Sequence, residues 1–477
     1  MTILSSGIAR AERLLGTDSR TRDVAKSLYS VVADHPIVSP HGHVSAQLLV
    51  ANDRFSEPAT LLITPDHYVT RLLHAHGIGL DELGVRNDVD PRTIWSRFAQ
   101  TWHAFLGTPV RYWIQQELID IFGIAEALTP ESADDIYDRI SELLAQDDYR
   151  PLALLERFRI DVLATTDDPA DSLDAHRRLR DATSTSVIPT FRADRYTLPA
   201  ASGWGDALRE LEIASGISCG TFAGLTHALR ERRQVFARAG GTSTDTGVID
   251  AWATPLNPVD AERLHRDALA GSISASDARA YRRNMLFRLA EMSAEDGLVM
   301  QLHAGVIRNH HSPTTARFGT DTGHDLPAPT EFTRPPQDLL ETFGTATNFR
   351  IVLFTVDEAS FSRDIAPLAG FYPSVYAGAP WWFLDAPRAI LRYREAVSET
   401  AGFYKTSGFI DDTRALCSIP VRHDMSRRLD AAYLATLVID GQIAATDAET
   451  LIDDHQRDSA LRLSPLRAVP TSSKEFT

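Results

Sequence analysis

The chain has 477 residues, and its content of 43% hydrophobic and 23% charged residues is ordinary for a soluble globular protein. The net charge of −16 argues against nucleic acid or an anionic membrane as a partner, and an anionic ligand would need nearby arginines. We expect no signal peptide, because Met1–Glu12 lacks the pattern, and no membrane span, because no apolar run reaches about 18 residues. Two cysteines, Cys219 and Cys417, are too few for a disulfide framework, so we expect a cytoplasmic protein.

The first 45 residues are predicted to form a helical segment and then a strand. Residues 1–33 have helical periodicity, and the apolar start of Ile37–Ser39 is typical of a short buried strand. His41 and His43 follow that strand with one glycine between them. On an extended chain, side chains two residues apart point to the same face, so these two imidazoles can bind one metal ion.

A second His-x-His pattern, His74-Ala75-His76, serves as a comparison for the first. It lies within Tyr68–His76, which is predicted to be a helix, where side chains two residues apart point about 200° apart. We therefore expect this pair to lie on the surface or in packing, not to chelate a metal.

Residues 46–158 are predicted to be a helical region inserted after the first strand, because they have helical periodicity and few strand signals. Clear examples are Pro91–Leu106, Tyr112–Phe122 and Ser132–Gln146, the last of which begins at a Ser-Ala-Asp-Asp cap pattern.

Short apolar runs recur after residue 159, separated by helical segments. They are Asp161–Thr165, Ser186–Thr190, Gly247–Ala251, Leu298–His303, Phe349–Phe354, Ser374–Gly378 and Phe409–Asp411. With Ile37–Ser39 they make eight strands that alternate with helices, which predicts an α/β fold: a distorted (β/α)₈ barrel of the TIM type. A doubly wound parallel sheet is the alternative. The expected division is 1–45, 46–158 as the insertion, 159–465 as the rest of the barrel, and 466–477 as a tail.

Polar side chains follow nearly every predicted strand. They are His41 and His43, Asp167 and Asp168, Arg192, Asp245 (just before its run), His303, Trp381 and Trp382, and Asp412. Barrel active sites are built at the carboxyl ends of the strands. A doubly wound sheet would not explain functional groups spread over nearly all strand ends.

These stretches together resemble the uronate isomerase (glucuronate isomerase) family of the amidohydrolase superfamily, over nearly the whole chain. The motifs are His41-Gly-His43, Asp66-His67-Tyr68, Thr165-Thr-Asp-Asp-Pro-Ala-Asp-Ser172, Met300-Gln-Leu-His303-Ala-Gly-Val-Ile-Arg308-Asn309, Trp381-Trp382-Phe383, and Asp412-Thr-Arg414 followed by Arg422-His423. The resemblance implies a distorted barrel with a divalent metal at its mouth, most often zinc, although Mn²⁺ or another divalent ion is possible. It also implies conversion of an aldohexuronate to a ketohexuronate: D-glucuronate to D-fructuronate, or D-galacturonate to D-tagaturonate.

Ketol isomerisation removes a proton from C2, stabilises an enediolate and returns a proton at C1. The resemblance makes His41, His43 and Asp412 the metal ligands, and a set of two imidazoles and one carboxylate leaves positions open for substrate. It also makes Asp412 the first candidate for the base, and Asp411 is a rival for either role. The alternative is that Asp412 only caps the helix after the strand. Arg414 is expected to stabilise the enediolate, unless it is a surface arginine.

Further roles are implied residue by residue. Tyr68 would pass protons or bind the intermediate, and His67 would contact a substrate hydroxyl. Arg192 or Arg308 can hold a carboxylate through two hydrogen bonds.

Three more residues are expected in the substrate site. Asp245 lies beside a predicted strand. His303 is expected to be a further metal ligand, to contact a substrate hydroxyl, or to be a core histidine hydrogen-bonded within the protein. Trp382 is expected either to stack on the sugar acid or to pack in the core. The residues flanking the motifs depart from the family pattern, which leaves the preferred uronate open.

Two other readings remain. A metal-dependent hydrolase is the nearest rival, although no fourth-strand lysine is evident to bridge two metals. The other is a non-catalytic sugar-acid-binding protein, which has no need to keep both a metal site and a base. We expect a small sugar acid as the partner, no nucleic acid or membrane, and a homo-oligomer.

Overall fold

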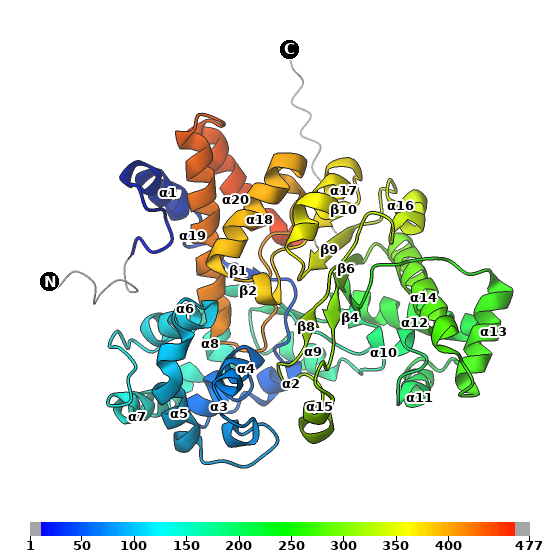
Figure 1. Cartoon of the computed structure of the whole chain (residues 1–477), viewed down its shortest axis with the longest axis horizontal. Coiled ribbons are helices and arrows are strands. Elements are labelled where there is room, and N and C mark those ends of the chain that lie inside the picture. The colour runs from blue at the N-terminus through cyan, green and yellow to red at the C-terminus, as the bar shows by residue number, and fades with distance from the viewer. Residues whose placement is uncertain (1–10, 463–477) are drawn as a thin grey trace.

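The computed structural model describes residues 11–462, with side chains up to residue 457 (Figure 1). The first ten residues of the predicted N-terminal helix and the predicted tail at 466–477 lie outside the described residues. Within the described part, helix α1 spans Ser19–Val32. Asp18 caps its N-terminus, and the Asp18 side chain accepts from two backbone N–H groups. None of the helices in this part of the chain is both long and apolar enough to cross a membrane.

Two parallel sheets form the centre of the mixed α/β fold. The first has the order β1 (Ile37–Ser39), β2 (Ile160–Ala164) and β3 (Ser186–Ile188). The second has the order β10 (Val375–Ala377), β9 (Ile351–Thr355), β6 (Val299–Ala304), β5 (Ser243–Val248) and β4 (Phe191–Arg192). Strands β7 (Val306–Ile307) and β8 (Leu326–Pro327) form a small antiparallel pair. Every residue of β6 and β9 is buried, as expected for parallel strands covered on both faces.

Backbone contacts connect the ends of the sheets. A parallel bridge joins Asp167, shortly after β2, to Phe191 of β4. Another joins Ala377, at the end of β10, to Thr406. The backbone N–H of His43 donates to the carbonyl of Thr413 at 2.9 Å, so the segment after Thr406 lies against the end of β1.

Two of the predicted strands are wrong in detail. Gly247–Ala251 was expected to be a strand, but β5 is Ser243–Val248, and its polar start carries no apolar signal. Phe409–Asp411 is not a strand, because residues 407–413 form no ladder and Asp412 has a left-handed backbone with φ of 41°. The other predicted runs correspond to observed strands with small shifts at their ends.

No strand interrupts residues 46–158, all of which the structure describes. The helices here are α2 (Ala46–Ala51), α3 (Pro58–Leu62), α4 (His67–Ala75), α5 (Pro91–Thr101), α6 (Pro109–Gln116), α7 (Ala133–Leu144) and α8 (Pro151–Arg157). A π-helical turn, Glu117–Ile121, continues α6. The predicted helices are confirmed, but the capping detail is wrong, because the Ser132 hydroxyl donates to the carbonyl of Ala127 instead of capping α7.

The remaining helices surround the two sheets. They are α9 (Asp174–Leu179), α10 (Asp194–Thr197), α11 (Trp204–Ser215), α12 (Phe222–Arg238), α13 (Pro258–Leu269), α14 (Ala275–Asp296), α15 (Ser312–Phe318), α16 (Gln337–Phe343), α17 (Ala366–Phe371), α18 (Pro387–Ala401), α19 (Ser418–Ile439) and α20 (Ala445–Arg462). Helices α3–α8 gather at one end of the long axis and α11–α14 at the other (Figure 1).

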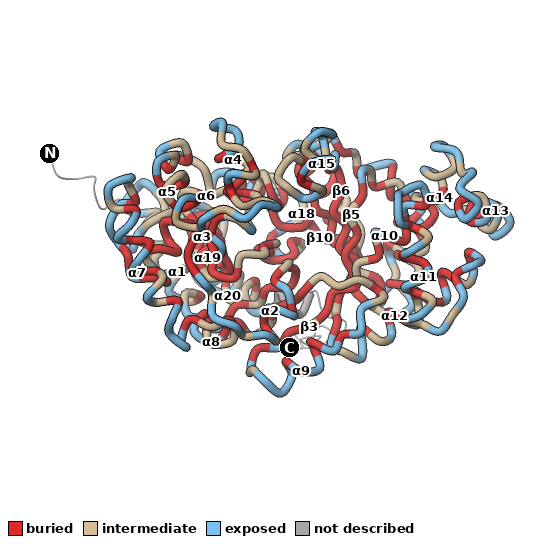
Figure 2. The backbone as a smooth tube through the Cα atoms, turned by 90° about the horizontal axis from the view of Figure 1, so that it is seen from below, coloured by how far each residue is buried: buried red, intermediate tan, exposed pale blue. Residues whose placement is uncertain are grey.

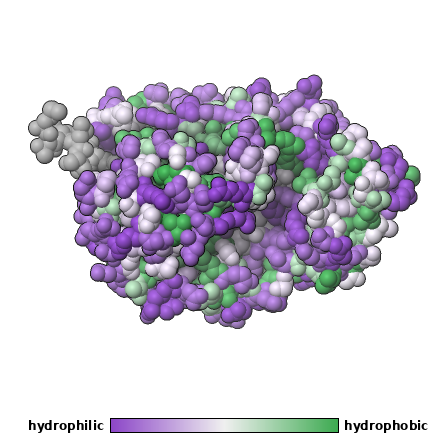
Figure 3. All heavy atoms as spheres, turned by 60° about the horizontal axis from the view of Figure 1, so that its bottom comes forward, coloured by the Kyte–Doolittle hydropathy of each residue, from purple (hydrophilic) through white to green (hydrophobic). Residues whose placement is uncertain are grey.

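Burial follows this arrangement. Buried residues run through β5, β6 and β10 in the middle of the molecule, and exposed residues lie on the outer helices (Figure 2). One hydrophobic cluster joins the 46–158 helices to β1 and α19, and a second joins β4–β6 to α11–α14. The surface seen in Figure 3 is mostly hydrophilic and is hollowed near its middle.

Candidate active site

All the predicted site residues line one cavity of about 520 Å³, which is in the usual range for a small-molecule site. They are His41, His43, His67, Tyr68, Arg192, Asp245, His303, Arg308, Trp382, Asp412 and Arg414. Most of them lie in or just after parallel strands, where carboxyl ends meet. The structure brings them together, while their roles stay predictions.

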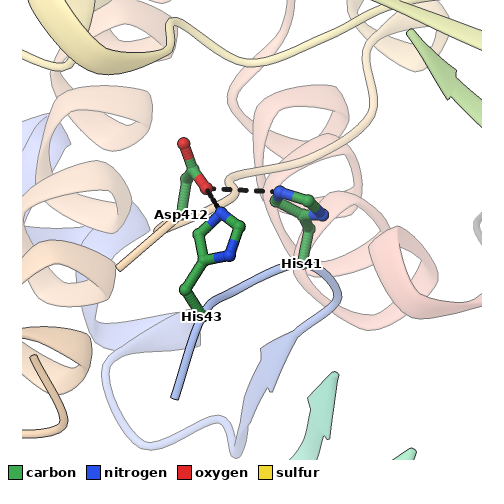
Figure 4. A group of neighbouring side chains, drawn as sticks. All are labelled: His41, His43 and Asp412. Atoms are coloured by element: carbon green, nitrogen blue, oxygen red, sulfur yellow. Dashed lines mark ion pairs between the residues drawn. The ribbon is translucent and has the colours of Figure 1, made fainter. Parts of the chain in front are cut away.

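Three of these side chains converge on one point (Figure 4). Oδ1 of Asp412 lies 3.2 Å from Nε2 of His41 and 2.9 Å from Nε2 of His43. The three residues can each offer one ligand atom, with all the atoms within 4.8 Å of one another. The His74 and His76 pair, in contrast, lies on and after helix α4 as predicted.

These residues fit a divalent metal ion. Asp412 Oδ1 is buried, and no described residue gives it a hydrogen bond of good geometry although both imidazoles are so close. Four ligands about 2.0–2.2 Å from a tetrahedral zinc ion lie about 3.3 Å apart, which the pair of Asp412 and His41 matches. Two histidines and a carboxylate are also a usual ligand set for catalytic zinc.

The glycine between the two histidines lies within van der Waals reach of the segment that carries Asp412. A Cβ atom at Gly42 would lie 3.4 Å from Oδ1 of Asp411 and 3.5 Å from the carbonyl of Thr413. The chain carrying Asp412 therefore packs directly on the His-Gly-His turn. Asp411 itself is fully buried and does not line the cavity, so its side chain is not placed to reach a substrate there.

The second oxygen of Asp412 faces an indole. Nε1 of Trp381 donates to Oδ2 of Asp412. Burial by itself raises the pKa of Asp412, but the His41 and His43 imidazoles outweigh burial and hold that pKa well below its usual range. Asp412 is therefore a carboxylate at neutral pH.

A second buried group adjoins these three residues. Asp245 accepts from Nδ1 of His303 at 2.7 Å and lies 3.1 Å from Nη1 of Arg192. Nε of Arg192 also donates to Asp194 at 2.9 Å. Burial raises the pKa of Asp245, but Arg192 and then His303 outweigh burial and lower it below its usual range. Asp245 is a charged anchor for both neighbours.

This anchor fixes the orientation of His303. Burial lowers the pKa of His303, so the ring is neutral at pH 7, and its Nδ1–H is held by Asp245. Nε2 then carries the lone pair, and no described residue hydrogen-bonds to it. His41, Asp245 and His303 could also hold an ion, but the Arg192 guanidinium already supplies a positive charge there.

Tyr68 and His67 enter the cavity from the first turn of α4. Asp66 caps this helix by accepting from the backbone N–H of Tyr68 at 2.8 Å. The Tyr68 ring packs edge-on against Trp113, with ring centroids 5.6 Å apart, and burial raises the pKa of Tyr68 above its usual value. The hydroxyl therefore stays protonated at neutral pH.

Two arginines line the cavity and are each paired with one aspartate. Nη1 of Arg308 lies 2.8 Å from Asp325, and Nη2 of Arg414 lies 2.5 Å from Asp321. Their side chains are 43% and 33% exposed, whereas Arg192 is 26% exposed and lies between two aspartates. Arg308 and Arg414 are the arginines that keep the most access to a ligand.

Comparisons with known proteins identify the family of the chain. A family model described as glucuronate isomerase matches residues 17–458. The chain belongs to the glucuronate isomerase family. It is 47% identical to a uronate isomerase from Corynebacterium efficiens over 455 residues, which cover 94% of this chain and 97% of that protein.

Solved structures of the glucuronate isomerase family have the same fold. A glucuronate isomerase from Caulobacter crescentus superposes with a TM-score of 0.94 at 40% identity, covering 97% of this chain and 98% of that one. A uronate isomerase from Thermotoga maritima gives 0.90 at 26% identity, covering 95% and 99%. A putative metal-dependent hydrolase from Lactobacillus casei, at 13% identity and a TM-score of 0.52, shares the fold.

Two of the polar residues that follow predicted strands, Asp167 and Asp168, do not line this cavity. Asp167 borders a second cavity of about 320 Å³, which also touches His43. Asp168 accepts from the Tyr196 hydroxyl at 2.6 Å and from the backbone of Ala170 at 2.9 Å, so it builds a turn.

Sequence reasoning also missed part of the site. Trp381 was noticed as part of a motif but was not chosen as a site residue. Asp194, Asp321 and Asp325 were not chosen, although Asp194 stands two residues after Arg192, a spacing that could have drawn attention to it. The loop around Asp321 has no periodic signal.

Proposed function

We propose that this uronate isomerase family member converts an aldohexuronate to a ketohexuronate by proton transfer through an enediolate. D-glucuronate to D-fructuronate and D-galacturonate to D-tagaturonate are the candidate reactions. The observation that carries the proposal is the convergence of His41, His43 and Asp412 in a cavity that also holds accessible arginines.

Zinc is the proposed ion, with Mn²⁺ or another divalent ion as the alternative. His41, His43 and Asp412 would hold it. A divalent ion bound there would stabilise the negative charge that develops on the substrate oxygens during enolisation. Two imidazoles, which bind a metal in their neutral form, and one carboxylate suit such an ion.

Proton transfer is assigned to Asp412 and Tyr68. Asp412 is ionised and lines the cavity, so it can accept the C2 proton once a substrate is bound beside it. Tyr68 keeps its proton and can donate to an oxygen of the intermediate. Arg414, two residues after Asp412, would stabilise the enediolate with its fixed positive charge.

Substrate recognition is assigned to the rim and the floor of the cavity. Arg308 is the first candidate for the carboxylate, because it is the most exposed arginine of the three. The Trp382 ring, with the Arg308 guanidinium 5.3 Å from its centroid, would pack on the sugar-acid chain. His303 would accept from a substrate hydroxyl through Nε2, and His67 would contact another hydroxyl.

The proposal also covers the fold, the compartment, the partner and the assembly. Within each parallel sheet the neighbouring strands follow one another in chain order, with β7 and β8 apart as an antiparallel pair, which supports a distorted (β/α)₈ barrel. Both cysteines are free and buried, which suits a reducing cytoplasm. A sugar acid as the partner and a homo-oligomeric assembly stay predictions.

Mass spectrometry and NMR together test the proposed function. Zinc-loaded protein is incubated with D-glucuronate, D-galacturonate and other uronates, and products are followed for a ketose. The expected product has the mass of its substrate. Products whose masses add up to the substrate plus one water would indicate a hydrolase, and binding without turnover would indicate a sugar-acid-binding protein. Either outcome rejects the isomerase.

A further inference from the structure

Arg422 and His423 are consecutive residues near the start of α19, and both are buried outside the cavity. The exposed fraction is 1% for Arg422 and 4% for His423. Each pairs with a buried aspartate, and neither aspartate lines the cavity. The two ion pairs thus lie one layer behind the site.

Two residues of the cavity wall have a positive φ angle, a backbone conformation that residues other than glycine rarely adopt. Asp412 has a φ of 41° and Trp382 a φ of 54°. A residue other than glycine is held in this left-handed region when the surrounding structure determines its conformation. What holds these two positions therefore controls the geometry of the site.

His423 holds the segment that contains Asp412. Nε2 of His423 lies 3.0 Å from Oδ2 of Asp411, and the other oxygen of Asp411 accepts from the backbone of Thr413 at 3.4 Å. The Asp411 carboxylate therefore spans Asp412 on both sides. It also lies against Gly42, between the two metal-binding histidines.

Arg422 holds the turn that contains Trp382. Its Nε donates to Oδ2 of Asp385 at 2.9 Å, and the backbone N–H of Asp385 donates to the carbonyl of Trp382 at 3.2 Å. The guanidinium also lies 4.3 Å from the ring centroid of Trp113, which packs on Tyr68. Arg422 thus supports both Trp382 and Tyr68 from behind.

We propose that Arg422 and His423 are positioning residues for the isomerase reaction. One turn of α19 fixes Asp412 through Asp411 and fixes Trp382 through Asp385, and so sets how the metal ligand faces the aromatic wall. The His423 part rests on the proposed metal site, whereas the Arg422 part rests only on the geometry of the wall.

Zinc affinity tests the role of His423, and kcat tests the role of Arg422. The His423→Leu variant should bind zinc about 10–100-fold more weakly in chelator competition, because Asp411 would lose the contact that fixes the neighbouring ligand Asp412, and the loss of contacts behind metal ligands typically has this effect. In His423→Gln a side-chain amide can donate to Asp411, so most of the affinity should return. Arg422→Lys should lower kcat about 10-fold while zinc affinity stays within about 3-fold, because lysine cannot reproduce the stacked, forked contact.

Two other buried residues provide matched controls. His265 and Arg233 are fully buried, make side-chain hydrogen bonds and do not line the cavity. His265→Leu and Arg233→Lys should lower the melting temperature without changing zinc affinity or kcat by more than about 2-fold. If His423→Leu fails to fold, Asp411→Asn removes the charge from the same contact and should weaken zinc binding in the same direction.

Several results would overturn the inference. One is zinc affinity equal to that of the unaltered protein in the His423 variants and in Asp411→Asn. Another is an Arg422→Lys variant that, like Arg233→Lys, has a lower melting temperature but an unchanged kcat. If the unaltered protein binds no zinc, the proposed metal chemistry fails and the His423 arm fails with it.

Discussion

Trp381 donates its indole N–H to Oδ2 of Asp412, while Oδ1 of the same carboxylate faces the imidazoles of His41 and His43. Asp412 therefore has one oxygen for the proposed metal and one oxygen held by the protein. A base in this position is oriented by the tryptophan and cannot rotate freely.

The Trp381→Phe variant tests this relationship. Phenylalanine keeps most of the ring but leaves Oδ2 without its donor, and a buried acceptor left unpaired costs about 1–3 kcal/mol. We expect kcat for a uronate to fall about 10–100-fold. Trp204→Phe is the control, since the Trp204 indole donates to the carbonyl of Tyr196 outside the cavity. Equal kinetics for the two variants would show that the Trp381 contact is not used.

Charge recognition can be assigned with three arginine variants. Arg308→Met should raise KM for D-glucuronate about 10-fold or more, because a hydrogen bond to a charged group contributes about 1.5–3 kcal/mol. The inhibition constant of neutral D-glucose should change far less. Arg317 lies on helix α15, pairs with Asp81 and does not line the cavity, so the KM of Arg317→Met should stay unchanged. If Arg192→Met shows the charge-selective effect and Arg308→Met does not, Arg192 holds the carboxylate.

A buried glutamate predicts a pH dependence of stability. Burial raises the pKa of Glu117 from 4.5 to about 8. Between these values the folded chain binds more protons than the unfolded chain, so this residue lowers the free energy of unfolding as pH rises. Glu117→Gln removes the effect, and the variant should be more stable by at most about 3 kcal/mol at pH 7 and by much less at pH 5.

Thermal unfolding at pH 5, 6, 7 and 8 measures this difference. The gap in melting temperature between Glu117→Gln and the unaltered protein should widen with pH. The exposed Glu399→Gln variant should show no such trend. A constant gap over the whole range would mean that Glu117 is not protonated in the folded protein.

Metal binding by the first histidine pair has a built-in comparison in the chain. His41→Ala and His43→Ala should each lower the zinc content of the purified protein, whereas His74→Ala and His76→Ala should not. The first pair faces Asp412, and the second lies on and after a helix with exposed side chains. Equal zinc content in all four variants would remove the metal site.

The family, the isomerase activity and the grouping of His41, His43 and Asp412 could be predicted, because the motifs and strand patterns that indicate them are short stretches of sequence. His41 and His43 follow an apolar strand, and Asp412 and Arg414 keep the same spacing at the other end of the chain. The family and its isomerase activity are confirmed, and the trio does converge.

Other parts of the site could not be predicted from local pattern. Strand β5 was displaced in the prediction because Ser243-Thr-Asp-Thr246 is polar, although the segment is mostly buried and pairs with β6. Asp325 reaches Arg308 because β7 and β8 pair, and Asp321 reaches Arg414 from the segment between α15 and β8. Partners so far apart in sequence have no periodic signal.

Turnover in D₂O tests the central claim most directly. Zinc-loaded protein is incubated with D-glucuronate in D₂O, and the product is examined by ¹H and ²H NMR. The account predicts a ketohexuronate that carries deuterium at C1, because the proton removed from C2 exchanges with solvent before one returns. No ketose at all, or a ketose that retains the substrate hydrogen completely at C1, would contradict proton transfer at Asp412.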